Sequence, residues 1–216
     1  SDIVTLFLMM DPLGNVPVFL AVLRPVPPLR RRVVILREVL IAYAILFACV
    51  PRATFLANLF PWWRSGSPGW AVTTAVALIS LPVAALALLG PWRHRILGPM
   101  GVVAAFTALV LAADAFTGSR LMVSSLMGVQ PVVAGRFYGF SNPGFALFAT
   151  GCPLGAVALA DWLVSRGQVR AAWLSVAVIG LVATVVDGAP GLGADFGGPP
   201  AIIPAFAVLA MLIAGV

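Results

Sequence analysis

The chain alternates long apolar stretches with short polar connections. Seven stretches are continuous rather than alternating in polarity, and most approach the roughly 17–25 residues that a helix needs to cross a bilayer. They are Ile3–Leu23, Val33–Val50, Trp70–Leu89, Ile96–Phe116, Pro143–Val164, Ala171–Val186 and Ala201–Val216. Backbone groups in hydrocarbon must be hydrogen-bonded, and barrel strands would alternate in polarity. The pattern therefore predicts an all-α fold, a polytopic transmembrane helical bundle of about seven spans.

The first apolar run is interrupted near its middle by Asp11, Pro12, Gly14, Asn15 and Pro17. Proline breaks the helical hydrogen-bond ladder. An ionisable residue at mid-membrane costs at least about 2.5 kcal/mol, so it normally faces a cavity or a partner. We expect the first span to be broken from Asp11 to Pro17. Two interpretations stay open: a solute site at the exposed backbone ends, or a buried turn in which Asp11 caps the second helical piece.

Composition agrees with a membrane location. Of the 216 residues, 62% are hydrophobic and 9% are charged, whereas soluble domains carry about 25% charged residues. The net charge of +6 comes from arginines that lie in the gaps between the apolar runs. We therefore interpret them as determinants of topology and as contacts to anionic lipid headgroups, and we predict no nucleic-acid partner.

The arginines are unevenly divided between the connections. With Arg52 assigned to the second connection, nine arginines belong to odd-numbered connections and four to even-numbered ones. The positive-inside rule then places the odd connections in the cytoplasm and the N-terminus outside. The connections 117–142 and 187–200 would share the outer face. We expect Asp114 and Asp161 to be interfacial, with Asp161 close to Arg166 or Arg170.

The two outer connections carry the other candidate site. The first contributes Arg136, Tyr138 and Asn142, and the second contributes Asp187 and Asp195 within a glycine-rich run. Arginine offers a bidentate fork, and glycine lets the backbone approach a ligand closely. These residues predict an outward pocket for an anionic or zwitterionic group, or for a metal held by two carboxylates. The alternative is a pair of turns in which Arg136 pairs with one aspartate.

Metal and cofactor signatures are weak. The single histidine, His94, lies between two arginines, and we interpret Cys49 and Cys152 as small packing residues. We therefore predict no cofactor and no resident metal.

A family resemblance begins in the first apolar run. Leu6–Leu20, followed by Arg30–Arg32 and Arg37-Glu38, resembles the start of the MarC family of bacterial inner-membrane proteins over residues 3–49. That family is grouped with small neutral amino-acid transporters, although its function is poorly established. The resemblance implies transport of a small polar solute. It also implies that the pathway residues are Asp11, Gly14, Asn15 and Pro17.

A second resemblance covers residues 121–216. The runs Gly135–Gly139 and Asp187–Gly198 resemble uncharacterised multi-pass proteins of actinobacteria. Two resemblances in one chain would be explained by a fusion, a chimeric assembly or a generated sequence. We also expect the chain to be a fragment of a longer protein.

One membrane domain over residues 1–216 accommodates both resemblances. Residues 1–50 would form a MarC-like helical hairpin, residues 51–120 the connecting spans, and residues 121–216 the C-terminal spans with the two outer loops.

The leading functional hypothesis is a transporter-like protein of the bacterial inner membrane for a small polar solute such as a neutral amino acid, and not an enzyme. Its expected partners are the lipid bilayer, the solute and further copies of itself. One alternative is a membrane enzyme that acts at the outer leaflet on a lipid-linked or anionic substrate. The other is a non-catalytic membrane protein.

Overall fold

The computed structural model describes residues 27–123, 125–128 and 139–215. The chain divides into two units, Ser1–Tyr43 and Ala44–Val216. The long helices are α3 (Pro28–Leu56), α4 (Pro68–Leu89), α5 (Gly98–Phe116), α7 (Asn142–Val164), α8 (Val169–Gly188) and α9 (Pro199–Ala214). Short 3-10 turns, η1 (Ala57–Leu59), η2 (Trp62–Arg64) and η3 (Pro91–His94), lie in the first two connections between them.

These helices follow the apolar runs of the sequence and confirm the all-α transmembrane fold. Within the described residues there is no strand, and five helices, α3, α4, α5, α7 and α8, are long and apolar enough to cross a bilayer. The sixth, α9, is equally apolar but has 16 residues. The chain is therefore a multi-pass membrane protein. The predicted break from Asp11 to Pro17 lies outside the described residues.

The described part of the first unit is the beginning of α3. Its large apolar side chains, among them Val33, Leu36 and Tyr43, are exposed, as expected of a helix surface that faces lipid. Its charged residues Arg37 and Glu38 form an ion pair of 2.6 Å with each other. This exposed pair contributes little to stability.

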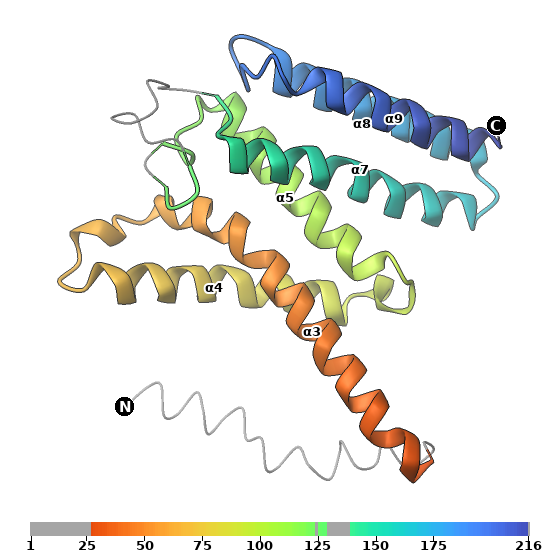
Figure 1. Ribbon diagram of the computed structural model, residues 1–216, viewed down its shortest axis with the longest axis horizontal. Coiled ribbons are helices and arrows are strands. Elements are labelled where there is room, and N and C mark those ends of the chain that lie inside the picture. The colour runs from red at the N-terminus through yellow and green to blue at the C-terminus, as the bar shows by residue number, and fades with distance from the viewer. Residues whose placement is uncertain (1–26, 124, 129–138, 216) are drawn as a thin grey trace. The chain divides into compact units, whose positions relative to one another are not determined.

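The second unit is built on consecutive antiparallel helices. The α5 helix crosses α7, α7 packs on α8, and α8 lies alongside α9 (Figure 1). The rest of the unit adds α4 against α5, and α9 also contacts α7.

Two apolar clusters hold the second unit together. The larger one joins α5, α7, α8 and α9 and includes Cys152. The smaller one joins the end of α3 to α4 and α5 and includes Cys49. Both cysteines are free and buried, so they occupy packing positions as their apolar setting predicts.

Candidate functional site

The structure describes some of the predicted site residues and not others. Those outside the described residues are Asp11, Gly14, Asn15, Pro17, Arg136 and Tyr138. Their proposed roles stay predictions. Asn142, Asp187 and Asp195 are described, and the site is built here from them and from the residues around them.

Asp187 lies in the last turn of α8 and is fully buried. Neither of its carboxylate oxygens has a hydrogen-bond partner, and no described cation forms an ion pair with it. Removing a charge from water costs several kcal/mol unless a counter-charge or donors replace the lost solvation. Among the described residues, nothing supplies the Asp187 carboxylate with that counter-charge or with those donors.

The glycine-rich loop that follows α8 folds directly over this carboxylate. The backbone N–H of Asp195 donates to the carbonyl of Asp187 at 3.0 Å, and Gly193 N–H donates to the carbonyl of Val186 at 2.8 Å. A Cβ on Gly198 would overlap Asp187 Oδ2 and would lie 2.8 Å from Phe145 Cε2. The absence of a side chain at Gly198 is what lets the loop close over Asp187.

Asp195, the second predicted acid, has a local role. Its Oδ1 accepts a hydrogen bond of 3.0 Å from the N–H of Gly197, two residues later. This is the pattern of an Asx turn, which shapes a loop. The two aspartates therefore differ: Asp195 builds the loop, whereas the carboxylate of Asp187 is unpartnered within the described residues.

The two predicted outer motifs are brought together. Phe140 N–H donates to the carbonyl of Gly193 at 2.8 Å, and Gly139 N–H donates to Ser119 Oγ at 3.2 Å. Gly139 has φ +84° and lies so close to the Gly193 carbonyl that no Cβ would fit. Asn142 begins α7 next to this segment, but its side chain is exposed.

Asp114 continues the same polar network at the end of α5. It is buried, and its carboxylate accepts hydrogen bonds from Leu121 N–H at 2.8 Å and Met122 N–H at 3.2 Å. Asn58 then donates to the carbonyls of Leu121 and Val123. The loops 117–123, 139–141 and 189–198, called here the capping loops, therefore close one end of the bundle.

Asp114, expected to be interfacial, lies in the last turn of α5 with its side chain buried, and its depth in the membrane stays a prediction. Its side chain folds back onto the following loop, where its two oxygens accept hydrogen bonds from the backbone amides of Leu121 and Met122.

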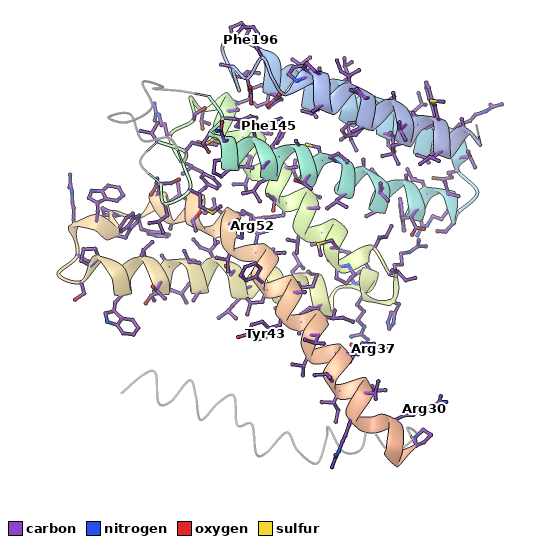
Figure 2. The ribbon with its side chains drawn as sticks, in the orientation of Figure 1. Arg30, Arg37, Tyr43, Arg52, Phe145 and Phe196 are labelled. Carbon is purple, nitrogen blue, oxygen red and sulfur yellow. The ribbon has the colours of Figure 1, made fainter. Side chains whose placement is uncertain are left out.

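Arg52 is a candidate that sequence reasoning missed. It was assigned to the second connection, but α3 continues through it to Leu56, and Arg52 is fully buried in the second unit (Figure 2). None of its three guanidinium nitrogens has a hydrogen-bond partner, and its described contact is a cation–π one, 4.9 Å from the Phe106 ring centroid. The sequence did contain evidence for this position, because the largely apolar segment Ala53–Phe60 after Arg52 indicates that the helix continues past it.

Arg52 lies on the bundle side of the capping loops. Asn58, which binds those loops, follows it by six positions in a continuous helical path, a rise of about 9 Å. In membrane proteins, a buried arginine without an ionic partner, as Arg52 is among the described residues, is typical of a solute or ion path.

Asp161 is paired differently from the prediction. Its Oδ2 lies 2.9 Å from Arg95 Nη1, not near Arg170, and Arg166 stacks over the Trp162 ring at 4.2 Å. The packing of α5 on α7 brings Arg95 to Asp161. Because the two residues are 66 positions apart, this ion pair could not be predicted from their positions in the sequence.

The described residues contain no group of three or more His, Cys, Asp or Glu side chains that could hold a metal ion. Among the described residues, the two buried ionic side chains without hydrogen-bond partners are the carboxylate of Asp187 on α8 and the guanidinium of Arg52 on α3. Such groups suit the binding of charged or zwitterionic solutes.

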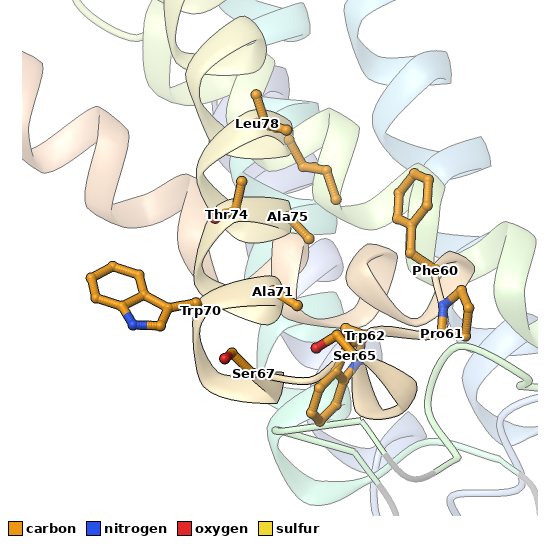
Figure 3. Close-up of a pocket in the computed structure, with 11 residues that line it drawn as sticks. Phe60, Pro61, Trp62, Ser65, Ser67, Trp70, Ala71, Thr74, Ala75 and Leu78 are labelled. Atoms are coloured by element: carbon orange, nitrogen blue, oxygen red, sulfur yellow. The ribbon is translucent and has the colours of Figure 1, made fainter. Parts of the chain in front are cut away.

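An open groove of about 770 Å³ lies between the α3–α4 connection and α4 (Figure 3). Phe60, Pro61 and Trp62 form one side, and Ala71, Ala75 and Leu78 lie on the other, while the Trp70 ring points away. Its walls are almost entirely apolar and hold no charged residue, so it fits contact with lipid chains rather than with a polar solute.

Comparison with known proteins gives a match that is confined to the N-terminal quarter. Residues 1–60 match the MarC family of integral membrane proteins. The UPF0056 inner membrane protein YhgN of Escherichia coli is 50% identical over 46 residues, which are 21% of this chain and 23% of that protein. A UPF0056 membrane protein of Buchnera aphidicola is 44% identical over 46 residues, 21% of this chain and 24% of that one.

The match thus covers about a quarter of the length of these relatives. No solved structure matches. The resemblance of the N-terminal segment to the MarC family is confirmed. Arg52 lies within the matched residues, whereas Asp187 and its loop lie beyond them.

Proposed function

We propose that the protein is a transporter-like component of the bacterial inner membrane that moves a small polar solute, such as a neutral amino acid. The observation that carries this proposal is a pair of fully buried ionic side chains, Arg52 and Asp187, that have no ionic partner among the described residues. In a membrane bundle such charges are costly, and they are typical of solute and ion pathways.

The two charges match the two ends of a zwitterion. A guanidinium binds a carboxylate through a bidentate fork, and a carboxylate binds an ammonium group or a coupling cation. Because they lie on α3 and α8, we propose them as two separate binding positions along a path. In this proposal Asp11, Gly14, Asn15 and Pro17 form a further part of that path.

The MarC match supports the location. The matched relative of Escherichia coli is named an inner membrane protein, and the apolar helices require a bilayer. With the arginine-rich connections in the cytoplasm, the capping loops and Asp187 would face the outside. Asp187 would then lie beneath the capping loops at the outer end of the path.

The test is uptake of labelled neutral amino acids by the full chain in proteoliposomes, with Asp187→Asn and Arg52→Gln. A charged hydrogen bond contributes about 1.5–3 kcal/mol, so each substitution should lower apparent affinity or uptake roughly 10- to 100-fold. Because each also removes an unpaired buried charge, the melting temperature should stay the same or rise.

Matched controls separate function from folding. Asp161→Asn and Arg64→Gln remove the same charges from exposed positions and should leave uptake within about twofold of the parent protein, since exposed ion pairs contribute little. Uptake that is unchanged in Asp187→Asn, Arg52→Gln and Asp11→Asn alike would overturn the proposal. A fall in uptake that only accompanies a lowered melting temperature would indicate structural roles instead.

A further inference from the structure

The end of the bundle opposite the capping loops carries a cleft with a different character. There the α4–α5 connection meets the α7–α8 connection, because Arg95 pairs with Asp161 at 2.9 Å and also donates to Ser165 Oγ. A cleft of about 700 Å³ lies between α5 and α7 beside this contact. Neither Arg52 nor Asp187 lines this cleft.

Two arginines and two tryptophans frame the mouth of the cleft. Arg95 and Arg166 line it together with Trp92 and Trp162. Arg166 lies 4.2 Å from the Trp162 ring and has no described anionic partner. Trp92 is held in place by a 3.1 Å hydrogen bond from Nε1 to the carbonyl of Ala87. Tryptophan prefers the depth of lipid headgroups, and arginine forks bind phosphate.

The charge at this end is positive. Arg93 lies in the α4–α5 connection and Arg170 in the first turn of α8, while Asp161 pairs with Arg95. Since Asp161 already pairs with Arg95, no described acid pairs with Arg166, and its guanidinium can bind an external anion. Basic pockets at helix ends in membrane proteins typically receive anionic headgroups.

The floor of the cleft continues into an apolar groove. A second cavity of about 420 Å³ shares Ala105, Gly155 and Leu159 with the first and extends between α5, α7 and α8 to Ala112 and Val182. Along α5, Ala112 follows Val102 by ten positions, a rise of about 15 Å. That is half of the roughly 30 Å hydrocarbon core, the thickness that one leaflet's chains fill.

A basic, tryptophan-framed mouth joined to an apolar groove one leaflet deep has the shape and polarity of a single lipid molecule. We propose that this cleft binds an anionic phospholipid, with the phosphate between Arg95 and Arg166 and one acyl chain along the groove between α5 and α7. A free phosphate would leave the groove unfilled, and in a zwitterionic lipid the headgroup's own ammonium group would weaken the attraction of its phosphate to this basic mouth.

The experiment is native mass spectrometry of the delipidated full chain, titrated with phosphatidylglycerol or with phosphatidylcholine of the same chains. We expect phosphatidylglycerol to bind about tenfold more tightly, and Arg166→Gln to remove most of this preference, since one charge-assisted contact is lost. Arg64→Gln, an exposed arginine that does not line the cleft, is the matched control and should change nothing. Arg166→Gln leaves the Arg95–Asp161 pair intact, so folding is preserved.

Two further binding measurements test whether the ligand is a whole lipid rather than its headgroup or a free phosphate. Phosphatidylglycerol with six-carbon chains should bind at least about tenfold more weakly than the long-chain lipid, because roughly 0.8 kcal/mol is lost for each methylene no longer buried. Inorganic phosphate should not displace the long-chain lipid. Equal binding of the two lipid classes, equal losses in Arg166→Gln and Arg64→Gln, or displacement by phosphate would each overturn the proposal.

Discussion

Two buried aspartates show how the same residue type serves different purposes in this bundle. Asp114 is satisfied, because backbone amides of Leu121 and Met122 donate to its carboxylate. Asp187 is equally buried, yet neither of its oxygens has a partner within the described residues. A buried carboxylate that accepts backbone hydrogen bonds holds a loop in place. A buried carboxylate without a partner lowers the stability of the fold and holds nothing in place. Burial alone therefore does not distinguish the two aspartates; the presence or absence of a partner among the described residues does.

The loop over Asp187 provides a test at the scale of one residue. In Gly198→Ala the new Cβ would overlap Asp187 Oδ2, so the loop must move outward. We expect a loss of roughly 1–3 kcal/mol of stability, measured as a lower melting temperature in detergent, together with reduced uptake.

Gly191→Ala is the control for this substitution, because it lies in the same loop with nothing within 4 Å of an added Cβ. Its melting temperature should stay close to that of the parent protein. Equal behaviour of the two variants would mean that the loop does not close tightly over the carboxylate.

At the scale of the elements, small residues set the distance between α5 and α7. A Cβ on Gly155 would lie 3.3 Å from Ala105 Cα, and one on Gly151 would lie 3.0 Å from the Ala104 carbonyl oxygen. Without a hydrophobic force between helices in lipid, such close backbone approach supplies the packing energy. These contacts also shape the floor of the lipid cleft.

Gly101→Ala tests this packing. Its Cβ would overlap that of Ala158 on α7, so the helices must separate. We expect destabilisation of roughly 1–3 kcal/mol from overpacking, visible as a lower melting temperature of the full chain in detergent.

The matched substitution is Gly69→Ala in the first turn of α4, where an added Cβ meets nothing within 4 Å. Alanine has the higher helix propensity, so this variant should be neutral or more stable by up to about 1 kcal/mol. If Gly101→Ala proved as harmless as Gly69→Ala, close packing of α5 on α7 would be contradicted.

At the scale of the whole second unit, the two ends of the bundle differ in chemistry. One end carries the capping loops with Asp187 and the glycine-rich run, and the other carries Arg93, Arg95, Arg166 and Arg170. Consecutive antiparallel helices place alternate connections at opposite ends, which is why the odd and even connections separate in space. The charge asymmetry predicts that the arginine-rich end is cytoplasmic.

Cysteine labelling tests this orientation. We expect Phe196→Cys in the capping loops to react with a membrane-impermeant maleimide in intact cells, and His94→Cys to react only after the membrane is opened. Both positions are exposed. The native Cys49 and Cys152 are buried, so the unsubstituted chain should give a low background. The reverse pattern would contradict the proposed topology.

Most of the membrane architecture could be predicted from the sequence, because it depends on local composition. Hydrocarbon accepts only continuous apolar segments with paired backbones, so the predicted run Pro143–Val164 became α7 at Asn142–Val164, and Trp70–Leu89 became α4 at Pro68–Leu89. The sequence also indicated the Asp187 loop as a candidate site, since aspartate and repeated glycine are visible in the chain itself, and its function stays a prediction.

The partners of the polar side chains were decided by the tertiary structure alone. Whether Arg52 lies in a connection or in the core depends on how far α3 continues and on which face of α3 packs against the neighbouring helices. Asp161 meets Arg95, 66 positions away, because α5 crosses α7 there. Sequence determines which segments enter the membrane, since the free energy of transfer into lipid depends on the composition of each segment by itself. Helix packing determines which charges find partners, since that depends on contacts between segments far apart in the chain.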